Sequence, residues 1–370
     1  MSLRIGYRWA LTTFFSILVC LTSYSAEESN DASAKSLTQE LESLRAAHDV
    51  PAMGAFVLQG DGILEQATVG TRSAKDDTPV GQDARWHLGS NTKAMTATLA
   101  GILVEEGLLQ WDTTLGEILG ARAPDMDPGH RDTTLTMLLS HTGGLAANID
   151  WFNAPEDRVA CVAEILSAPP AHEHGEYLYS NVGYTVAGAM MEVITGEKWE
   201  VLLQTRLFEK LGMTRVGFGA PTDPESAWGH NSGWIRWIPV SPEKKNSDNA
   251  PVLGPAGTVH ADLGSYARFL AAHLAGARGE DNVVSAKTYE ILHTPPAGRT
   301  YALGWGTAER AWADGKTLSH NGSNTMWFAA AWLAPEKNLA FFAVTNVGGK
   351  KGPQVVNDAI EAMISRHIKP

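Results

Sequence analysis

The pattern of apolar and polar positions predicts matching segments at the two ends of the chain. Each end combines one amphipathic helix with two runs that alternate like strands. The predicted segments are a helix over residues 37–48 and strands over 52–58 and 64–69, then strands over 326–333 and 339–345 and a helix over 355–366. The two ends therefore mirror one another, which indicates that they form one α/β layer.

The middle of the chain is dominated by helical periodicity and loop signals. Its predicted helices cover residues 134–139, 158–166, 183–195, 199–211 and 263–274. We therefore expect a single domain over residues 26–370. Its α/β layer takes about 36–111 and 294–370, and a helical subdomain takes about 112–293.

Composition narrows the classes of partner. With 370 residues, 44% hydrophobic and 19% charged, the chain can bury a sizeable core. Its formal charge of -12 argues against nucleic acid, because nucleic-acid binding requires a basic face. We expect a small-molecule or short-peptide substrate and no cofactor, while the oligomeric state stays open.

The first 25 residues have the features of a signal peptide. Arg4 and Arg8 precede an apolar run over residues 11–21, and the small residues Ser23, Ser25 and Ala26 follow. The run is short for a stable membrane span, so we expect export to the periplasm or the medium. Cys20 offers lipid anchoring as an alternative, although Val19 before it is larger than such a site prefers. Cleavage takes the formal charge from -12 to -14 and leaves Cys161 alone, so no internal disulfide can form.

The first candidate catalytic residues are Ser90 and Lys93, which are separated by two residues at the start of an apolar helical pattern. Free N–H groups at a helix start can hold an oxyanion, and Lys93 lies one turn further on the same face. Burial between apolar walls would lower the pKa of the lysine, so that its neutral amine could take the serine proton. The alternative is that Ser90 only caps the helix and Lys93 is a surface charge. A second copy, Ser241 to Lys244, runs into a polar segment that we expect to be a solvated loop.

Two later motifs supply further groups. Tyr179 could carry a proton as a phenol or phenolate, and Asn181 could present its amide to a substrate or to Lys93. The alternative is packing and capping at a helix start. His320 and Gly322 precede a strand signal, where glycine lets a substrate approach the backbone. The N–H of the next residue, Ser323, would pair with that of Ser90 as an oxyanion hole.

Other motifs carry less chemistry. His141 and Gly143 repeat the histidine-any-glycine spacing, and His141 is expected in a loop or behind the site. His172 and His174 have no further ligand cluster at metal-binding spacing, so no metal site is expected. There is no Gly-x-Ser-x-Gly turn or phosphate loop, which disfavours an α/β-hydrolase or a nucleotide enzyme.

Together these motifs resemble the serine β-lactamase and penicillin-binding protein family, in its branch with class C β-lactamases, D-alanyl-D-alanine carboxypeptidases, D-aminopeptidases and esterases. Segments 86–89, 138–145 and 254–257 also look like recurring segments of this family. The resemblance implies an α+β fold, in which an antiparallel sheet is flanked by N- and C-terminal helices and carries an inserted, mostly helical subdomain. It also implies Ser90 as nucleophile, Lys93 and Tyr179 as proton carriers, and a covalent acyl-enzyme that water releases.

One departure bears on the substrate. The family's β-lactamases and carboxypeptidases usually have lysine where this chain has His320, and a neutral imidazole binds a carboxylate less well. The expected function is therefore an exported serine hydrolase acting on an ester, an amide or a D-amino-acid peptide. A true β-lactamase or D-alanyl-D-alanine carboxypeptidase is a further possibility. The alternative from another class is a catalytically idle peptidoglycan-binding or sensor protein.

Overall fold

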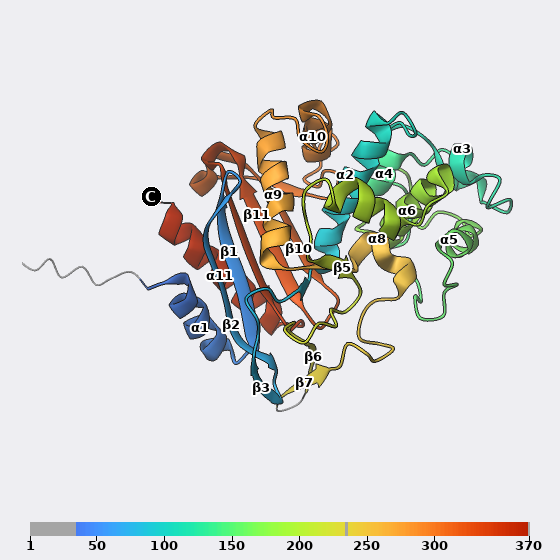
Figure 1. Ribbon diagram of the computed structural model, residues 1–370. Coiled ribbons are helices and arrows are strands. Elements are labelled where there is room, and N and C mark those ends of the chain that lie inside the picture. The colour runs from blue at the N-terminus through green and yellow to red at the C-terminus, as the bar shows by residue number, and fades with distance from the viewer. Residues whose placement is uncertain (1–34, 234–235, 369–370) are drawn as a thin grey trace, which may run out of the picture. The chain divides into compact units, whose positions relative to one another are not determined.

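A seven-stranded antiparallel sheet forms the centre of the structure, a computed structural model that describes residues 35–233 and 236–368 (Figure 1). The strand order is β3-β2-β1-β12-β11-β10-β9. The strands are β1 (Ala52–Gln59), β2 (Gly62–Ser73), β3 (Asp76–Pro79), β9 (Gly306–Arg310), β10 (Gly315–Ser323), β11 (Phe328–Ala334) and β12 (Leu339–Thr345). Because β1 pairs with β12, the two ends of the chain meet in the middle of the sheet.

Helices cover both faces of this sheet, as the alternation of apolar side chains requires. Helices α1 (Leu37–His48) and α11 (Lys351–His367) pack on one face, and α9 (Leu263–Ala277) packs on the other (Figure 1). In β12, Phe341 belongs to the core under α1 and α11, whereas Phe342 belongs to the larger core. The predicted α+β fold, with an antiparallel sheet and flanking terminal helices, is confirmed.

Shorter elements complete the fold. A three-stranded sheet has the order β4-β8-β5, and β6 pairs with β7. These strands are β4 (Trp86–His87), β5 (Val216–Phe218), β6 (Gly229–Ser232), β7 (Trp237–Val240) and β8 (Val259–Ala261). The remaining α-helices are α2 (Thr92–Glu105), α3 (Leu115–Leu119), α4 (Leu135–Leu139), α5 (Arg158–Leu166), α6 (Asn181–Thr195), α7 (Trp199–Leu203), α8 (Gly254–Gly257) and α10 (Ala286–His293).

Three elements differ from the sequence expectations. Helix α9 falls in the range assigned to the helical subdomain, yet it packs against β1 and β12 of the main sheet. The helix expected over 199–211 stays α-helical only to Leu203 and continues as a π-helical turn over Gln204–Phe208. The strand expected from residue 326 begins at Phe328, because Met326 and Trp327 belong to the turn after β10.

The predicted signal peptide over residues 1–25 and the alternative lipid site at Cys20 lie outside the described residues. Within residues 35–233 and 236–368, no helix combines the length and apolar character needed to cross a bilayer. Cys161 is buried and free in α5, as expected of a small apolar side chain.

Candidate active site

Ser90 lies in a tight turn between the small sheet and the central helix. The turn is a 3₁₀ segment, η1 (Gly89–Asn91), that runs directly into α2, and Ser90 is partly exposed. Gly89 has φ +52°, and a Cβ atom there would lie 2.2 Å from the backbone nitrogen of Ser323. Only glycine suits this position, because both the backbone angle and the approach of β10 exclude a side chain.

Lys93 reaches back to the serine from the first turn of α2. Its Nζ lies 3.0 Å from Ser90 Oγ, 2.7 Å from Asn181 Oδ1 and 2.6 Å from the carbonyl oxygen of Ala256. The side chain is fully buried, and burial holds the pKa of its amine well below the ordinary lysine value. The surface-charge interpretation of Lys93 is thus wrong.

The three oxygen partners of Lys93 can serve both protonation states of its amine. An ammonium can donate to all three, including Ser90 Oγ. A neutral amine has two N–H donors and one lone pair, and its two pure acceptors here are Asn181 Oδ1 and Ala256 O. The two N–H groups can therefore donate to the two acceptors while the lone pair faces the hydroxyl of Ser90. In this state the lysine is arranged to accept the serine proton.

Tyr179 covers the same pair of residues. Lys93 Nζ lies 4.9 Å from the centre of the Tyr179 ring. Burial raises the pKa of the Tyr179 phenol above its ordinary value, and the nearby hydroxyl of Ser90 offsets this only in part. Of the two forms left open by the sequence, the structure therefore favours the neutral phenol, which can donate a proton.

Asn181 begins α6, where Ser180 caps the helix by accepting the N–H of Gly183. The Asn181 N–H donates to the carbonyl of Ala147 at 2.9 Å, and its Nδ2 donates to Asn148 Oδ1 at 2.8 Å. Its remaining side-chain oxygen faces Lys93. The helix is thus capped by Ser180 and not by Asn181, and the Asn181 amide is oriented toward the lysine, which was one of its two expected roles.

His320, Gly322 and Ser323 precede strand β11, as expected, and they also form the end of β10, a strand that the sequence analysis did not predict. Strand β9 pairs with β10 only as far as Ser319, so these residues extend past it toward the serine turn. A Cβ atom on Gly322 would lie 1.9 Å from Leu88 O and 2.7 Å from Ser90 N. The strand backbone and the serine turn therefore touch, which explains why β10 carries glycine here.

His320 is a buried and neutral group. Its Nδ1 lies 2.7 Å from the carbonyl of Asn321 and its Nε2 lies 2.8 Å from the hydroxyl of Tyr301. This pattern assigns the proton to Nδ1 and leaves Nε2 to accept from the tyrosine. Burial lowers the pKa of His320 to about 3, and the positive charge that Lys93 carries when it is protonated acts in the same direction. The imidazole therefore supplies no positive charge at neutral pH.

Further groups surround the site, and one of them, His141, was expected in a loop or behind the site and lies there. His141 accepts the N–H of Ser180 at 3.0 Å, and its ring centre lies 4.3 Å from that of Tyr179 and 4.5 Å from that of Tyr301. Tyr301 and the Ala256 carbonyl also contact the site. The Ala256 carbonyl lies in the recurring segment 254–257, which was the only sequence sign of it, because a backbone carbonyl depends on no particular residue type. Tyr301 belongs to none of the sequence motifs.

The second serine-lysine copy does not build a site. Lys244 is exposed, and the contact within Ser241 to Lys244 is a backbone turn of 3.1 Å. The expectation that the following residues form a solvated loop is only partly right. Ser247 is buried, and the side chain of Asp248 packs inside the protein, where its exposed fraction is 8%.

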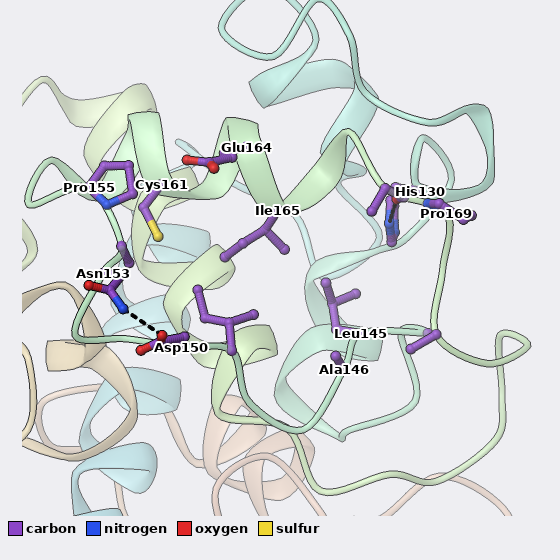
Figure 2. A pocket seen from close by; sticks show the side chains of 15 residues that line it. His130, Leu145, Ala146, Asp150, Asn153, Pro155, Cys161, Glu164, Ile165 and Pro169 are labelled. Atoms are coloured by element: carbon purple, nitrogen blue, oxygen red, sulfur yellow. Dashed lines mark hydrogen bonds between the residues drawn. The ribbon is translucent and has the colours of Figure 1, made fainter.

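A pocket of about 430 Å³ lies beside α5 and does not include the candidate catalytic residues (Figure 2). Leu145, Ile149 and Ile165 form much of its apolar wall. The loop that lines it also carries Ala146 and Ala147, whose carbonyls accept from Ser180 and Asn181. The pocket is thus separated from Ser90 by the loop that supports the start of α6.

No group of three or more histidine, cysteine or acidic side chains is placed to hold a metal ion within the part of the chain that the structure describes. His172 Nε2 faces the carbonyl of Leu145 at 3.3 Å, and His174 Nε2 faces Thr133 Oγ1 at 2.9 Å. These two side chains therefore have partners within the fold.

Comparison with known proteins identifies the family and proteins of the same fold. The family model described as Beta-lactamase matches residues 37–362. Penicillin-binding protein 4 of Amycolatopsis lactamdurans is 28% identical over 336 residues, which cover 84% of each chain. Lovastatin esterase of Penicillium rubens is 26% identical over 227 residues, 55% of each chain. The octameric penicillin-binding protein homologue from Pyrococcus abyssi has the same fold, with a TM-score of 0.72, 19% identity and coverage of 90% of this chain and 78% of that one.

Proposed function

The chain belongs to the beta-lactamase family, and from this premise we propose that it is a serine hydrolase with a covalent acyl-enzyme intermediate at Ser90. The observation that carries the proposal is the buried Lys93 amine, which lies 3.0 Å from Ser90 Oγ with two acceptors for its N–H groups. A surface lysine would stay protonated and could not act as a base at neutral pH.

The geometry supports an ordered proton route. Lys93 takes the proton of Ser90 as Oγ attacks the carbonyl carbon of the substrate, and the carbonyl π electrons move to its oxygen. The N–H groups of Ser90 and Ser323 then stabilise the oxyanion. As the tetrahedral intermediate collapses, the Tyr179 phenol gives its proton to the leaving group and regains one from the Lys93 ammonium. Water attacks the acyl-enzyme by the reverse of these transfers and frees Ser90.

The neutral state of His320 favours substrates without an essential carboxylate at this position. An imidazole whose pKa lies at about 3, and which already hydrogen-bonds with Tyr301, offers no fixed charge to an anion. Esters, amides and D-amino-acid peptides bound through another end satisfy this condition. The similarity to an esterase supports the same substrate class, whereas β-lactams and C-terminal carboxypeptidase substrates fit less well.

The test is covalent labelling of the purified protein. A fluorophosphonate probe should label the wild type, and Ser90→Ala should abolish this labelling because the nucleophile is lost. Ser241→Ala is the matched control, since Ser241 begins the second serine-lysine copy, and it should label like the wild type. Undiminished labelling of Ser90→Ala would remove Ser90 as the nucleophile.

A panel of neutral esters, D-amino-acid amides and a chromogenic β-lactam then identifies the substrate class. We expect turnover of at least one neutral substrate at a rate above that of the β-lactam. A wild type that labels at Ser90 but turns over none of the panel supports the idle binding or sensor protein instead.

A further inference from the structure

A buried group of polar side chains lies behind the serine turn. The N–H of Gly89, the residue before the nucleophile, donates to His87 Nδ1 at 3.1 Å. This bond leaves Nδ1 without a proton, so the neutral imidazole carries its proton on Nε2. His87 Nε2 lies 2.8 Å from Asp248 Oδ1. The contact is not aligned along the N–H bond, so its attraction is electrostatic rather than that of a linear hydrogen bond.

The same carboxylate also holds the end of β10. Asn324 Nδ2 donates to Asp248 Oδ1 at 2.7 Å. The side-chain oxygen of Asn324 accepts the N–H groups of Met326 and Trp327, at 3.1 and 3.2 Å. Asn324 thus closes the turn that follows Ser323, and Asp248 connects this turn to His87.

The side chains that make these contacts are shielded from water. His87 is fully buried, Asn324 is 5% exposed, and the side chain of Asp248 is 8% exposed. The His87 ring also stacks on Trp327, with ring centres 5.5 Å apart. A buried polar group is destabilised when it loses its partner, so the three side chains hold one another in place.

Asp248 lies in a loop that a neighbouring residue also attaches to the site. Its neighbour Asn249 donates through Nδ2 to the carbonyl of Gly257 at 2.9 Å. Gly257 ends α8, the helix whose Ala256 carbonyl contacts Lys93. The segment after the second serine-lysine copy therefore supports the active serine turn from behind.

We propose that His87, Asp248 and Asn324 are positioning residues that hold the two arms of the oxyanion hole, Ser90 N–H and Ser323 N–H, at a fixed separation. The inference rests on the proposed function, because it assigns these two N–H groups to the oxyanion. His87 sets the turn at Gly89, Asn324 sets the turn after Ser323, and Asp248 joins the two. None of the three touches the reacting atoms.

The first test compares two carboxylate positions on one loop. Asp248→Ala removes the carboxylate that accepts from Asn324 and attracts His87, and it should slow single-turnover acylation of Ser90 on the order of 10- to 100-fold. The apparent substrate affinity should change little, since the oxyanion forms after binding. Asp248→Asn keeps an oxygen that accepts from Asn324 but loses the charge that attracts His87, so it should recover the rate in part. Glu243→Gln, on the exposed part of the same loop, should acylate like the wild type.

Each acylation rate is divided by the concentration of protein that can be labelled at Ser90. A misfolded fraction of a variant therefore does not lower its measured rate. An Asp248→Ala rate equal to that of the wild type would overturn the inference. If the wild type itself does not acylate at Ser90, the proposed function fails, and a measurement without catalysis decides the positioning claim.

That second measurement is amide hydrogen exchange on the unreacted proteins. Exchange of segments 86–91 and 320–327 should accelerate in Asp248→Ala relative to Asp248→Asn and Glu243→Gln, because both turns lose their common support. Unchanged exchange in both segments would show that Asp248 does not hold them and would overturn the inference independently of any activity.

Discussion

At the scale of single residues, burial converts an ordinary lysine into a base. Lys93 has no carboxylate among its hydrogen-bond partners, which are a hydroxyl, an amide oxygen and a backbone carbonyl. Desolvation is therefore the cause of its lowered pKa, and no ion pair restores the charge. The same burial keeps His320 neutral, so the two basic side chains nearest the serine do not repel each other at neutral pH.

The pH dependence of acylation should report Lys93 and not His320. Only the neutral amine accepts a proton, so the rate should rise with pH through the lowered pKa of Lys93. His320 has a pKa of about 3 and is uncharged throughout the range from about pH 5 to pH 9. His320→Gln should therefore change the magnitude of the acylation rate but leave the shape of its pH profile unchanged.

Stopped-flow labelling at several pH values measures this. Lys93→Arg is the control, because arginine stays protonated and cannot replace the base, and its rate should fall by about 10²–10⁴-fold. A change in the acylation rate near pH 6.5 that is present in the wild type and absent in His320→Gln would contradict the neutral state of the imidazole.

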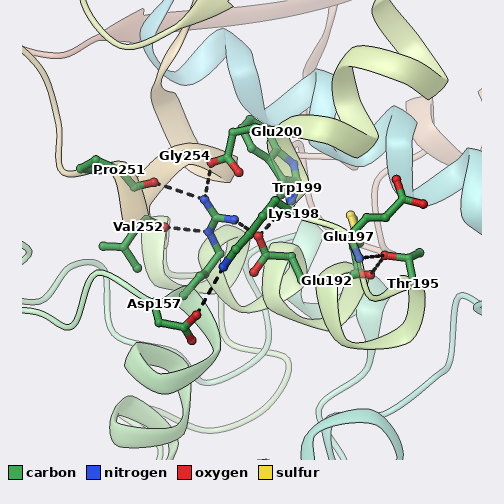
Figure 3. A network of polar contacts seen from close by, with 12 residues as sticks. Asp157, Glu192, Thr195, Glu197, Lys198, Trp199, Glu200, Pro251, Val252 and Gly254 are labelled. Atoms are coloured by element: carbon green, nitrogen blue, oxygen red, sulfur yellow. Dashed lines mark hydrogen bonds and ion pairs between the residues drawn. The ribbon is translucent and has the colours of Figure 1, made fainter.

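At the scale of elements, the helices around the site depend on one buried ionic network (Figure 3). Arg158, in α5, contacts the carboxylates of Glu192 in α6 and Glu200 in α7. It also donates to the carbonyls of Pro251 and Val252, at 3.2 and 3.1 Å, in the segment that leads into α8. Arg158 therefore connects three helices to the segment that brings the Ala256 carbonyl to Lys93.

Arg158→Met should destabilise the protein by about 3–5 kcal/mol, because it leaves buried Glu192 without its cation. Lys198→Met is the control: Lys198 pairs with Asp157 where both side chains are more than half exposed, so its loss should cost less than about 1 kcal/mol. Urea unfolding measures both free energies. Equal midpoints for the two variants would show that the buried network contributes no more than a surface pair.

At the scale of the whole molecule, buried neutral histidines should make the fold sensitive to mild acid. Burial lowers the pKa of seven histidines, one of which is His130. For the other six, the pKa falls well below the usual value in two, to about 4 in two and to about 3 in two. They are His141 and His273, His230 and His260, and His293 and His320. In the unfolded chain each takes up a proton near pH 6.5. At pH values between the lowered pKa of the folded state and the pKa of the unfolded chain, the unfolded state binds more protons. The free energy of unfolding therefore falls as pH decreases.

The free energy of unfolding should therefore drop between about pH 7 and pH 5, by up to about 1.4 kcal/mol per pH unit for each histidine once pH is well below 6.5. Aspartate and glutamate titrate mainly below this window, which separates the two contributions. Urea midpoints across this range measure the slope. A midpoint that stays constant from pH 7 to pH 5 would contradict the buried neutral state of these groups.

Much of the fold was predictable from local pattern. The predicted helices over 37–48 and 158–166 and the predicted strand over 339–345 coincide with α1, α5 and β12. Their periodicity is strong, and Ser36 and Asp157 cap the two helices through their side chains. The π-helical end of α7 and the packing of α9 on the sheet were not predictable, because tertiary contacts decide both.

The sequence by itself determined that Ser90 and Lys93 share one face of a helix start, and it separated this copy from the one at Ser241. It could do so because spacing along a helix is a local property. Only the tertiary structure decided that Lys93 is buried, that the Ala256 carbonyl and Asn181 receive its N–H groups, and that His320 is neutral. It also placed Asp248 of the expected solvated loop behind the serine turn. Desolvation and backbone contacts arise between distant segments, so no residue pattern records them.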